Sequence, residues 1–128
     1  YWMYGDYTSV DCVFQIAIIS FANSIIFTCL YKATTVDCGR SPLFNRQQDE
    51  DDGGSAKMIC HFCQAYRKDH FVHHCSTCGH CIEMMDHHCF FLGQCVGRGN
   101  MKYFMQFCYY ISALLVYGNF RVLRFFYT

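Results

Sequence analysis

The chain has 128 residues, and its composition argues against an ordinary soluble domain. Hydrophobic residues make up 53% of it, aromatic residues 19% and charged residues only 16%, whereas soluble domains carry about 25% charged residues. The net charge of +0 provides no general attraction to a polyanion, so no nucleic-acid partner is expected.

The first segment, residues 1–11, is aromatic and weakly acidic and contains no lysine or arginine. Tyrosine and tryptophan side chains in such a segment are typical of a membrane–water interface. The basic start and small-residue cleavage site of a signal peptide are missing. We interpret residues 1–11 as a non-cytosolic segment, and because the chain starts with Tyr1 rather than methionine we expect it to be a fragment.

The next stretch, residues 12–31, is an uncharged run of 20 residues that ends at Lys32. A helix needs about 20 residues to cross the hydrocarbon core of a bilayer, so the run predicts a transmembrane helix over residues 12–32. The polar exceptions, Gln15 and Asn23, are interpreted as groups that hydrogen-bond between helices. The alternative for these two residues is contact with a bound ligand. The alternative for the run as a whole is a buried helix of a soluble protein.

Residues 33–57 are predicted to be a cytosolic linker. The segment is polar, contains the only proline, Pro42, and carries an acidic run at residues 49–52. Such a composition cannot bury a hydrophobic core. We interpret the acidic run as a solvated loop rather than as a calcium or partner site.

A second apolar run covers residues 103–120 and is uncharged for 18 residues between Lys102 and Arg121. It predicts a second transmembrane helix over residues 101–122, with residues 123–128 as a truncated end. Gly118 and Asn119 weaken the far end of this run.

Most basic residues lie between the two runs. None precedes the first run, Arg121 and Arg124 follow the second, and the other eight of the ten are Lys32, Arg40, Arg46, Lys57, Arg67, Lys68, Arg98 and Lys102. Because positive charge stays on the cytoplasmic side of a membrane, the segment between the runs is predicted to be cytosolic. The reducing cytosol keeps thiols free of disulfides.

That cytosolic segment contains a metal-binding pattern at residues 60–95, with all seven histidines and seven of the eleven cysteines of the chain. Cys-x2-Cys pairs interleaved with histidines are typical of zinc sites, whereas disulfides need no histidine. Two Cys3His sites would use six cysteines and leave one over. Spacing alone does not decide which residues share a metal, because Cys75, Cys78 and Cys81 are each three residues apart. With so little apolar content, folding and metal binding are expected to be coupled.

The tetrad Asp86-His87-His88-Cys89 contains the parts of an activated nucleophile. A thiol reacts as the thiolate, an adjacent imidazole can take its proton, and a carboxylate can orient that imidazole. The residues alone leave a second interpretation open, in which Cys89 is a zinc ligand or an unreactive thiol.

This stretch resembles the cysteine-rich domain of the DHHC family of protein S-acyltransferases (palmitoyltransferases). The resemblance covers residues 60–104 and rests on Cys60, Cys63, His74, Cys75, Cys78, Cys81, Asp86, His87, His88, Cys89, Cys95, Asn100 and Phe104. It implies an α-helical membrane protein. Two transmembrane helices would flank a cytosolic, loop-rich, cysteine-rich catalytic domain at residues 58–100, with two zinc sites and little regular secondary structure.

The resemblance also implies the role of each site residue. One structural zinc ion would be held by Cys60, Cys63, His74 and Cys81, and the other by Cys75, Cys78, His88 and Cys95. Cys89 would be the acyl-accepting nucleophile, His87 its general base and Asp86 the group that orients His87. Two alternatives stay open: His87 and His88 could exchange roles, and His73 could replace His74, because the spacer after Cys63 is one residue longer than is usual in the family.

The chain departs from the family pattern at several points. Phe90 and Phe91 stand where the family usually has Pro-Trp, which puts the packing on the substrate side in doubt. The usual Lys/Arg-Pro-x-Arg element and the Thr-Thr-x-Glu motif are absent, and only two of the usual four transmembrane helices are predicted. We therefore expect the chain to be part of an enzyme.

The implied function is transfer of a long-chain acyl group, palmitoyl, from acyl-CoA to cysteines of protein substrates through a thioester on Cys89. Arg98 and Lys102 are predicted to meet the CoA phosphates, with an ordinary positive-inside role as the alternative. The alternative function is a catalytically silent, membrane-anchored zinc module that recruits a partner protein.

The implied partners are acyl-CoA (palmitoyl-CoA), the lipid bilayer and membrane-proximal proteins with cytosolic cysteines. The implied location is an endomembrane (Golgi or endoplasmic reticulum) or the plasma membrane. There the chain would be part of an integral multi-pass protein with its active site on the cytosolic face.

Overall fold

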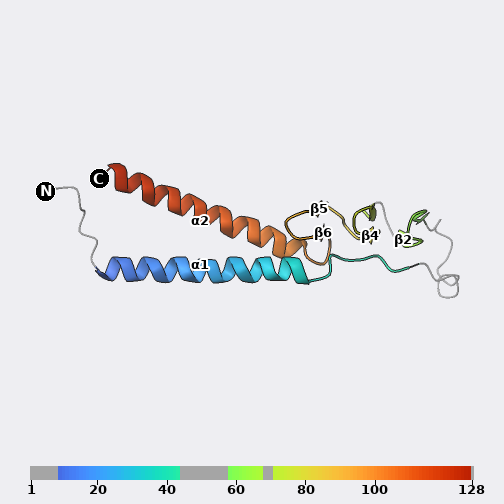
Figure 1. Ribbon diagram of the computed structural model, residues 1–128, viewed down its shortest axis with the longest axis horizontal. Helices are drawn as coiled ribbons and strands as arrows, with labels where there is room; N and C mark the ends of the chain where they lie inside the picture. The colour runs from blue at the N-terminus through green and yellow to red at the C-terminus, as the bar shows by residue number, and fades with distance from the viewer. Residues whose placement is uncertain (1–8, 44–57, 68–70, 128) are drawn as a thin grey trace. The chain divides into compact units, whose positions relative to one another are not determined.

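The computed structural model describes residues 9–43, 58–67 and 71–127. Helix α1 (Ser9–Thr35) and helix α2 (Met101–Tyr127) stand at the two ends of this order, with six short strands between them in the chain (Figure 1). The chain divides into two compact units. One comprises the chain up to Tyr31 and from Met105 onward, and the other runs from Lys32 to Phe104.

Helix α1 extends the predicted run 12–32 by three residues at each end and is 27 residues long. At 1.5 Å per residue its length is about 40 Å, more than the roughly 30 Å of a hydrocarbon core. Among the described residues, α1 is the one helix long and apolar enough to be a candidate membrane span. The side-chain amide of Asn23 donates to the carbonyl oxygen of Ile19 at 2.9 Å, so this amide is used within its own helix rather than only between helices as predicted.

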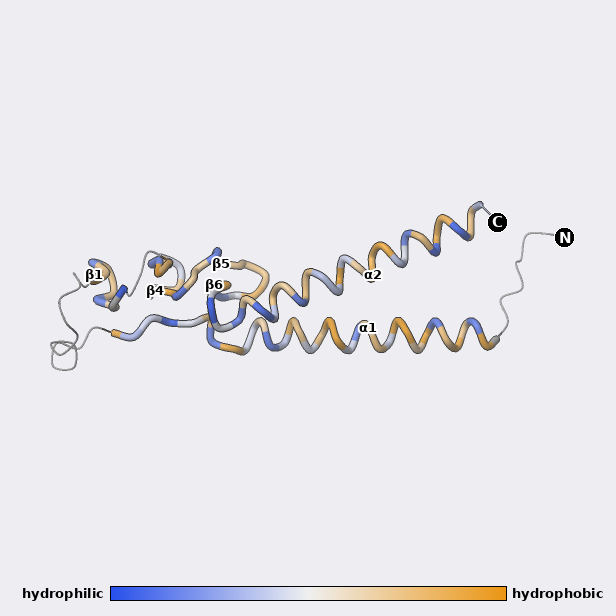
Figure 2. Tube along the Cα trace, turned by 180° about the vertical axis from the view of Figure 1, so that it is seen from behind, coloured by the Kyte–Doolittle hydropathy of each residue, from blue (hydrophilic) through white to orange (hydrophobic). Residues whose placement is uncertain are grey.

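Helix α2 also has 27 residues, and it continues through Gly118 and Asn119 without a break. The Asn119 amide donates to the carbonyl oxygen of Leu115 at 2.8 Å, which satisfies this polar group inside the helix. Figure 2 shows that hydrophilic positions interrupt α2 more often than α1. Because α2 does not meet the composition that marks α1 as a candidate span, the second membrane crossing stays a prediction.

Three antiparallel hairpins form the region between the helices. They pair β1 (Met58–Ile59) with β2 (Tyr66–Arg67), β3 (His73–Cys75) with β4 (His80–Ile82), and β5 (His87–Cys89) with β6 (Gln94–Val96). Each strand has two or three residues, so the region is loop-rich, as predicted. Isolated two-stranded hairpins are marginal in water, so these hairpins need further stabilisation.

The three hairpins share one type of turn. In each, the residue four places after a cysteine has positive φ and donates its N–H to the carbonyl oxygen of that cysteine. The pairs are Gln64 (φ 56°) to Cys60 at 3.0 Å, Gly79 (φ 74°) to Cys75 at 2.8 Å and Gly93 (φ 67°) to Cys89 at 3.1 Å. The repeated geometry places one cysteine at the same point of each hairpin.

The core of this unit consists of two small clusters in which cysteines are prominent. One contains Cys38, Cys75, Ile82 and Cys95, and the other contains Cys60, Ala65, Val72 and Cys81. Apolar clusters of this size cannot stabilise a domain by burial alone, and domains so small usually need metals, disulfides or assembly. Folding that depends on metal is therefore the expectation.

The segment after α1 packs against the hairpins. The Ser41 N–H donates to the carbonyl oxygen of Cys81 at 2.9 Å, and Arg40 forms a β-bridge with Ile82. Cys38 is only 2% exposed. The linker predicted over residues 33–57 therefore starts with an ordered part, because these residues complete the edge of a hairpin. The acidic run at residues 49–52 lies outside the described residues.

Candidate metal sites and catalytic site

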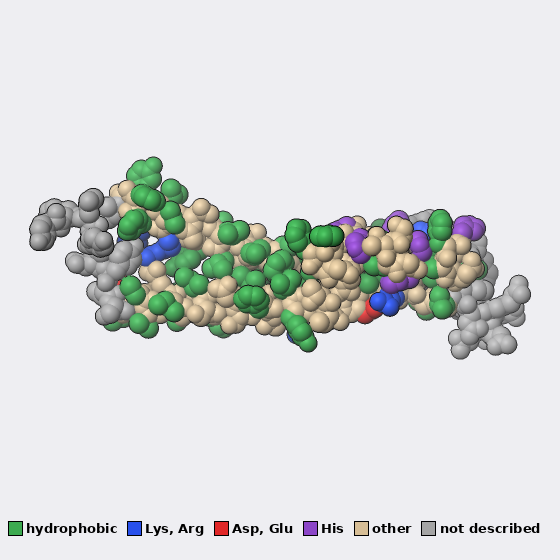
Figure 3. All heavy atoms as spheres, viewed as in Figure 1, with side chains coloured by type: hydrophobic (Ala, Val, Ile, Leu, Met, Phe, Trp, Pro, Cys, Tyr) green, Lys and Arg blue, Asp and Glu red, His purple; other side chains and the backbone are tan. Residues whose placement is uncertain are grey.

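Two groups of cysteine and histidine side chains lie within the hairpin unit. In each group the ligand atoms are within 4.8 Å of one another, and the groups are Cys60, Cys63, His74 and Cys81, and Cys75, Cys78, His88 and Cys95. Figure 3 shows the histidine side chains gathered over this part of the chain. The structure thus brings together the two sets of four residues that the family resemblance implies.

The distances within the groups suit a tetrahedral zinc ion. With Zn–S bonds of about 2.3 Å and Zn–N bonds of about 2.0–2.1 Å, tetrahedral geometry separates two sulfurs by about 3.8 Å and a sulfur from a nitrogen by about 3.6 Å. The Cys63 and Cys81 sulfurs are 3.6 Å apart, and those of Cys78 and Cys95 are also 3.6 Å apart. The Nδ1 atom of His88 is 3.3–3.6 Å from the three sulfurs of its group.

The protonation of the thiols also fits a cation at the centre of each group. Burial, together with the neighbouring sulfurs, raises the pKa of Cys81 and of Cys95 well above the ordinary value of a thiol. Three sulfurs this close cannot all be thiolates without a counter-charge. A divalent cation would supply that charge, so both groups fit zinc chemically as well as geometrically.

Each group joins the turn of one hairpin to the strands of the next. Cys60 and Cys63 come from the first turn, whereas His74 and Cys81 face each other across β3 and β4. The second group repeats this arrangement one hairpin later. Cys75 and Cys78 come from the second turn, and His88 and Cys95 face each other across β5 and β6. A metal ion in each group would therefore cross-link consecutive hairpins.

The structure distinguishes between the two adjacent histidines that the sequence left open. His74 lies in the first group, and its buried Nδ1 atom has no hydrogen-bond partner among the described residues. The Phe62 ring stacks on the His74 ring at 5.1 Å between centroids. His73 is exposed. A buried nitrogen without a partner is costly, and a metal bond would satisfy it.

A carboxylate, an imidazole and a thiol lie together on and beside β5. The Nδ1 atom of His87 is 2.7 Å from Oδ2 of Asp86, and the His87 side chain also hydrogen-bonds with the Cys89 thiol. His87 and Cys89 are two residues apart in a strand, so their side chains share one face. The Asp86 carboxylate, and next the Cys89 sulfur, raise the pKa of His87.

The thiol of Cys89 is buried, and it is the cysteine of the hairpin unit's third turn. Burial acts to raise its pKa, but the hydrogen bond with His87 and the N–H groups of Leu92 and Phe91 lower it below the ordinary value. A lowered thiol pKa beside a raised histidine pKa favours the thiolate–imidazolium pair. Cys89 belongs to neither metal-binding group.

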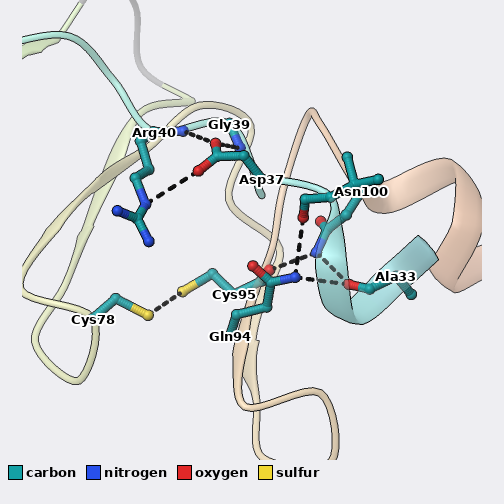
Figure 4. A network of polar contacts seen from close by, with 9 residues as sticks. Ala33, Asp37, Gly39, Arg40, Cys78, Gln94, Cys95 and Asn100 are labelled. Atoms are coloured by element: carbon teal, nitrogen blue, oxygen red, sulfur yellow. Dashed lines mark hydrogen bonds and ion pairs between the residues drawn. The ribbon is translucent and has the colours of Figure 1, made fainter. Parts of the chain in front are cut away.

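The β5–β6 hairpin is fastened to the end of α1 by two side-chain amides (Figure 4). Gln94 donates to the carbonyl oxygens of Ala33 at 2.8 Å and Val36 at 3.1 Å. Asn100, which is completely buried, donates to Ala33 at 3.1 Å and to Cys95 at 2.9 Å. The last carbonyl groups of a helix lack partners within the helix, so these amides satisfy an otherwise open end.

Phe90 and Phe91 follow Cys89 at the tip of the hairpin and are 88% and 93% exposed. Their rings contact each other edge to face at 6.3 Å. The Phe104 ring lies edge-on to the His87 ring at 5.4 Å between centroids. Aromatic side chains therefore follow the thiol directly in the chain and contact the imidazole next to it.

The two residues predicted to meet CoA differ in their surroundings. The Arg98 guanidinium is 3.2 Å from the Glu83 carboxylate, and its side chain is 67% exposed. Lys102 is exposed in the first turn of α2. No described contact brings either side chain to Cys89, so their role in binding CoA stays a prediction.

Sequence reasoning missed Gln94 and Cys38. Gln94 bonds to residues about 60 positions earlier in the chain, which no local motif announces. Cys38 packs in the cluster with Cys75 and Cys95, although it lies outside the concentrated Cys/His stretch. Its early position in the predicted linker concealed it.

The sequence of the chain is similar to those of known palmitoyltransferases. A family model described as DHHC palmitoyltransferase matches residues 54–128. The chain is 34% identical over 104 residues to palmitoyltransferase ZDHHC3-A of Danio rerio. The aligned region covers 75% of this chain and 33% of that protein. It is 38% identical over 74 residues to palmitoyltransferase ZDHHC15 of Xenopus laevis, covering 58% and 22%.

A plant relative is similar over a comparable range. The chain is 33% identical over 110 residues to the probable protein S-acyltransferase 15 of Arabidopsis thaliana, covering 76% of this chain and 43% of that protein. The chain thus spans between 22% and 43% of the length of these relatives.

Proposed function

The chain belongs to the DHHC palmitoyltransferase family, and on that premise we propose that it carries the acyl-transfer centre of a protein S-acyltransferase. The observation that carries the proposal is the array of Asp86, His87 and Cys89, in which one histidine contacts both a carboxylate and a thiol. The geometry supports Cys89 as nucleophile, His87 as general base and Asp86 as the group that orients His87.

In the first step the Cys89 sulfur attacks the thioester carbonyl carbon of a long-chain acyl-CoA. His87 takes the thiol proton, and because Nδ1 faces Asp86, Nε2 is the nitrogen left to hold it. The bond between the acyl carbon and the CoA sulfur breaks, and the departing CoA thiolate receives the proton. The products are free CoA and an acyl-enzyme thioester on Cys89.

In the second step a cysteine thiol of a protein substrate attacks that thioester. Its proton passes to His87 as its sulfur bonds to the acyl carbon, and Cys89 leaves as a thiolate. Each step exchanges one thioester for another of similar energy. No further energy source is required, and the substrate keeps the acyl group.

The two groups of ligand residues are proposed to hold structural zinc ions. Bound zinc would supply the cross-links that join consecutive hairpins, and its positive charge would offset most of the negative charge of the cysteine thiolates. All eight proposed ligands are then committed to metal. Cys89 remains the free thiol of the three hairpin turns.

A membrane setting is proposed from the two long helices and the distribution of basic residues. Helices α1 and α2 would cross the bilayer, with the hairpin unit on the cytosolic side of an endomembrane or the plasma membrane. The Lys32 ammonium lies 5.3 Å from the centre of the Tyr103 ring, a pairing suited to a membrane–water interface. Cys89 is only 13 residues before Lys102, which keeps the nucleophile near that interface.

The proposed donor is palmitoyl-CoA or a similar acyl-CoA, and the proposed acceptors are cysteines of membrane-proximal proteins. Lys102 and Arg98 would meet the CoA phosphates, and Lys102 is the more available of the two because Arg98 already pairs with Glu83. Exposed Phe90 and Phe91 would contact the acyl chain next to the thiol.

The second candidate function is a zinc-binding interaction module without catalytic activity. The arrangement of Asp86, His87 and Cys89 argues against it. A scaffold gains nothing from a histidine held between a carboxylate and a free thiol. The test is incubation of the full-length protein in membranes with a clickable palmitoyl-CoA analogue. A label sensitive to hydroxylamine and absent from Cys89→Ser is expected, whereas equal labelling of both proteins would exclude Cys89 as nucleophile.

A further inference from the structure

The three hairpins of the cysteine-rich unit repeat one metal-binding design. In the first two turns a Cys-x2-Cys pair is followed by a residue with positive φ, at Gln64 and Gly79. The pairs are Cys60 with Cys63 and Cys75 with Cys78, and each supplies two ligands of one metal-binding group. Turns of this kind present two thiolates to one metal ion.

The third turn has the same backbone geometry. Gly93 has φ 67°, and its N–H donates to the carbonyl oxygen of Cys89 at 3.1 Å, as Gly79 does to Cys75 at 2.8 Å. Cys89 faces Gln94 across its hairpin, five residues on, just as Cys75 faces His80. Cys89 is thus in the place of a first metal ligand.

The position of the second ligand differs. Three residues after Cys60 and Cys75 the chain has Cys63 and Cys78, whereas three residues after Cys89 it has Leu92, which is buried. The strand ligands are also missing for the third turn. Each of the first two turns shares its metal-binding group with the strands of the next hairpin. Within the part of the chain that the structure describes, β6 is followed by α2 and no fourth hairpin.

We propose that the turn from Cys89 to Gly93 is a third metal-binding turn in which Leu92 replaces the second thiol. In this role Leu92 keeps zinc away from Cys89 and leaves its thiol available. This inference rests on the proposed zinc sites and does not depend on acyl transfer. According to this proposal, the apolar side chain of Leu92 decides whether Cys89 binds a metal ion or stays available as a nucleophile.

A thiol at position 92 would complete a three-ligand set with chemistry typical of zinc. Cys89 and the new cysteine would supply two thiolates, and His87, which already contacts Cys89, would supply a nitrogen. Three protein ligands plus one water suffice for a zinc ion. The variant Leu92→Cys should therefore bind one zinc ion per chain more than the unmodified protein.

The experiment uses the full-length protein, dialysed against buffered free zinc and analysed for metal per chain. Leu92→Cys is expected to gain one zinc ion, and Cys89 is expected to become unreactive toward maleimide until the added ion is removed by mild chelation. The control variant Leu92→Ser, whose new side chain is nearly the same size as cysteine but has no thiol, should gain no zinc. The double variant Leu92→Cys with Cys89→Ser should also gain none.

Several results would overturn the proposal. The first is that Leu92→Cys keeps both proposed zinc ions but binds no additional one. The second is that Leu92→Ser gains as much zinc as Leu92→Cys. If Leu92→Cys loses the resident zinc and so fails to fold, Leu92→His tests the same position with an imidazole. An extra zinc ion in Leu92→His supports the proposal, and no extra ion in either variant contradicts it.

Discussion

The side-chain amide of Gln94 donates to the carbonyl oxygen of Ala33 at 2.8 Å, across 61 positions of the chain. Gln94 is also the residue that faces Cys89 in the β5–β6 hairpin. The end of α1 and the β5–β6 hairpin are therefore joined through the residue that pairs directly with the proposed nucleophile. This connection makes the position of Cys89 depend on the end of a proposed membrane helix.

Replacement of Gln94 by leucine should weaken this connection. The change removes the hydrogen bonds to Ala33 in the last turn of α1 and to Val36 just after it, at similar volume. Each lost hydrogen bond typically costs about 0.5–1.5 kcal/mol. We expect a lower free energy of unfolding, a slower formation of the acyl-enzyme and an unchanged zinc content. Heating followed by size-exclusion chromatography measures the stability.

The matched control is Gln106→Leu in α2, where the structure records no such bond. Gln106→Leu should behave like the unmodified protein. A Gln94→Leu protein as stable and as readily acylated as this control would show that the amide contributes nothing to the site.

The two adjacent histidines of β3 provide a matched test of the first metal site. His74→Ala removes a ligand, so this protein should lose one zinc ion per chain and the order of the first hairpin. His73→Ala alters an exposed side chain and should retain both ions. Metal analysis of the purified proteins distinguishes them, and loss of zinc in His73→Ala alone would reverse the assignment.

Replacement of Asp86 by asparagine should move the pH dependence of Cys89 alkylation. Asp86 raises the pKa of His87, and the His87 bond helps to lower the pKa of Cys89. The thiolate of the unmodified protein should therefore persist below the ordinary thiol pKa of about 8.5. In Asp86→Asn the thiol pKa should rise, so alkylation at neutral pH slows and recovers as the pH increases.

The same variant should form the acyl-enzyme more slowly at neutral pH, because a His87 that lacks its carboxylate partner is a weaker and less well oriented base. The loss should be a part of the about 10²–10⁴-fold that general base catalysis typically contributes. A full profile of alkylation rate against pH, with the modified cysteine identified by mass spectrometry, is the measurement. Superimposable profiles for Asp86→Asn and the unmodified protein would contradict the role of the carboxylate.

Gly97 is predicted to tolerate no side chain. A Cβ atom there would lie 2.5 Å from the carbonyl oxygen of Cys38 and 2.5 Å from a methyl group of Ile82. Gly97→Ala should therefore destabilise the hairpin unit by about 1–3 kcal/mol through overpacking. Gly118→Ala in α2 meets nothing within 4 Å and should instead stabilise its helix by up to about 1 kcal/mol. Thermal inactivation of the two variants gives the comparison, and equal effects would refute the packing argument.

The sequence predicted the existence of both long helices because each apolar run is local and continuous. It placed the end of the second helix at residue 122, whereas α2 continues to Tyr127 through residues that include Arg121 and Arg124. It could not divide the ligands from spacing alone, since Cys75, Cys78 and Cys81 offer two overlapping Cys-x2-Cys pairs. The hairpin register makes the division visible, because Cys81 faces His74 whereas Cys78 lies in the turn. Family resemblance supplied the same grouping without this physical reason.

The contacts between distant segments were beyond sequence reasoning. Cys38 and Ser41 were included in the predicted linker, yet both are buried against the hairpins. Their burial depends on how the chain leaves α1, and polar composition does not encode that path. The anchoring role of Gln94 depends on the same geometry.

We expect Cys89 alone among the hairpin cysteines to receive the acyl group. The most direct measurement is single-turnover acylation of the full-length protein with palmitoyl-CoA, followed by proteolysis at mildly acidic pH and fragmentation mass spectrometry. The expected result is a hydroxylamine-sensitive acyl group on Cys89, with the eight proposed ligand cysteines and histidines unmodified and zinc retained. An acyl group located on Cys38 or on a ligand cysteine, with Cys89 unmodified, would contradict it.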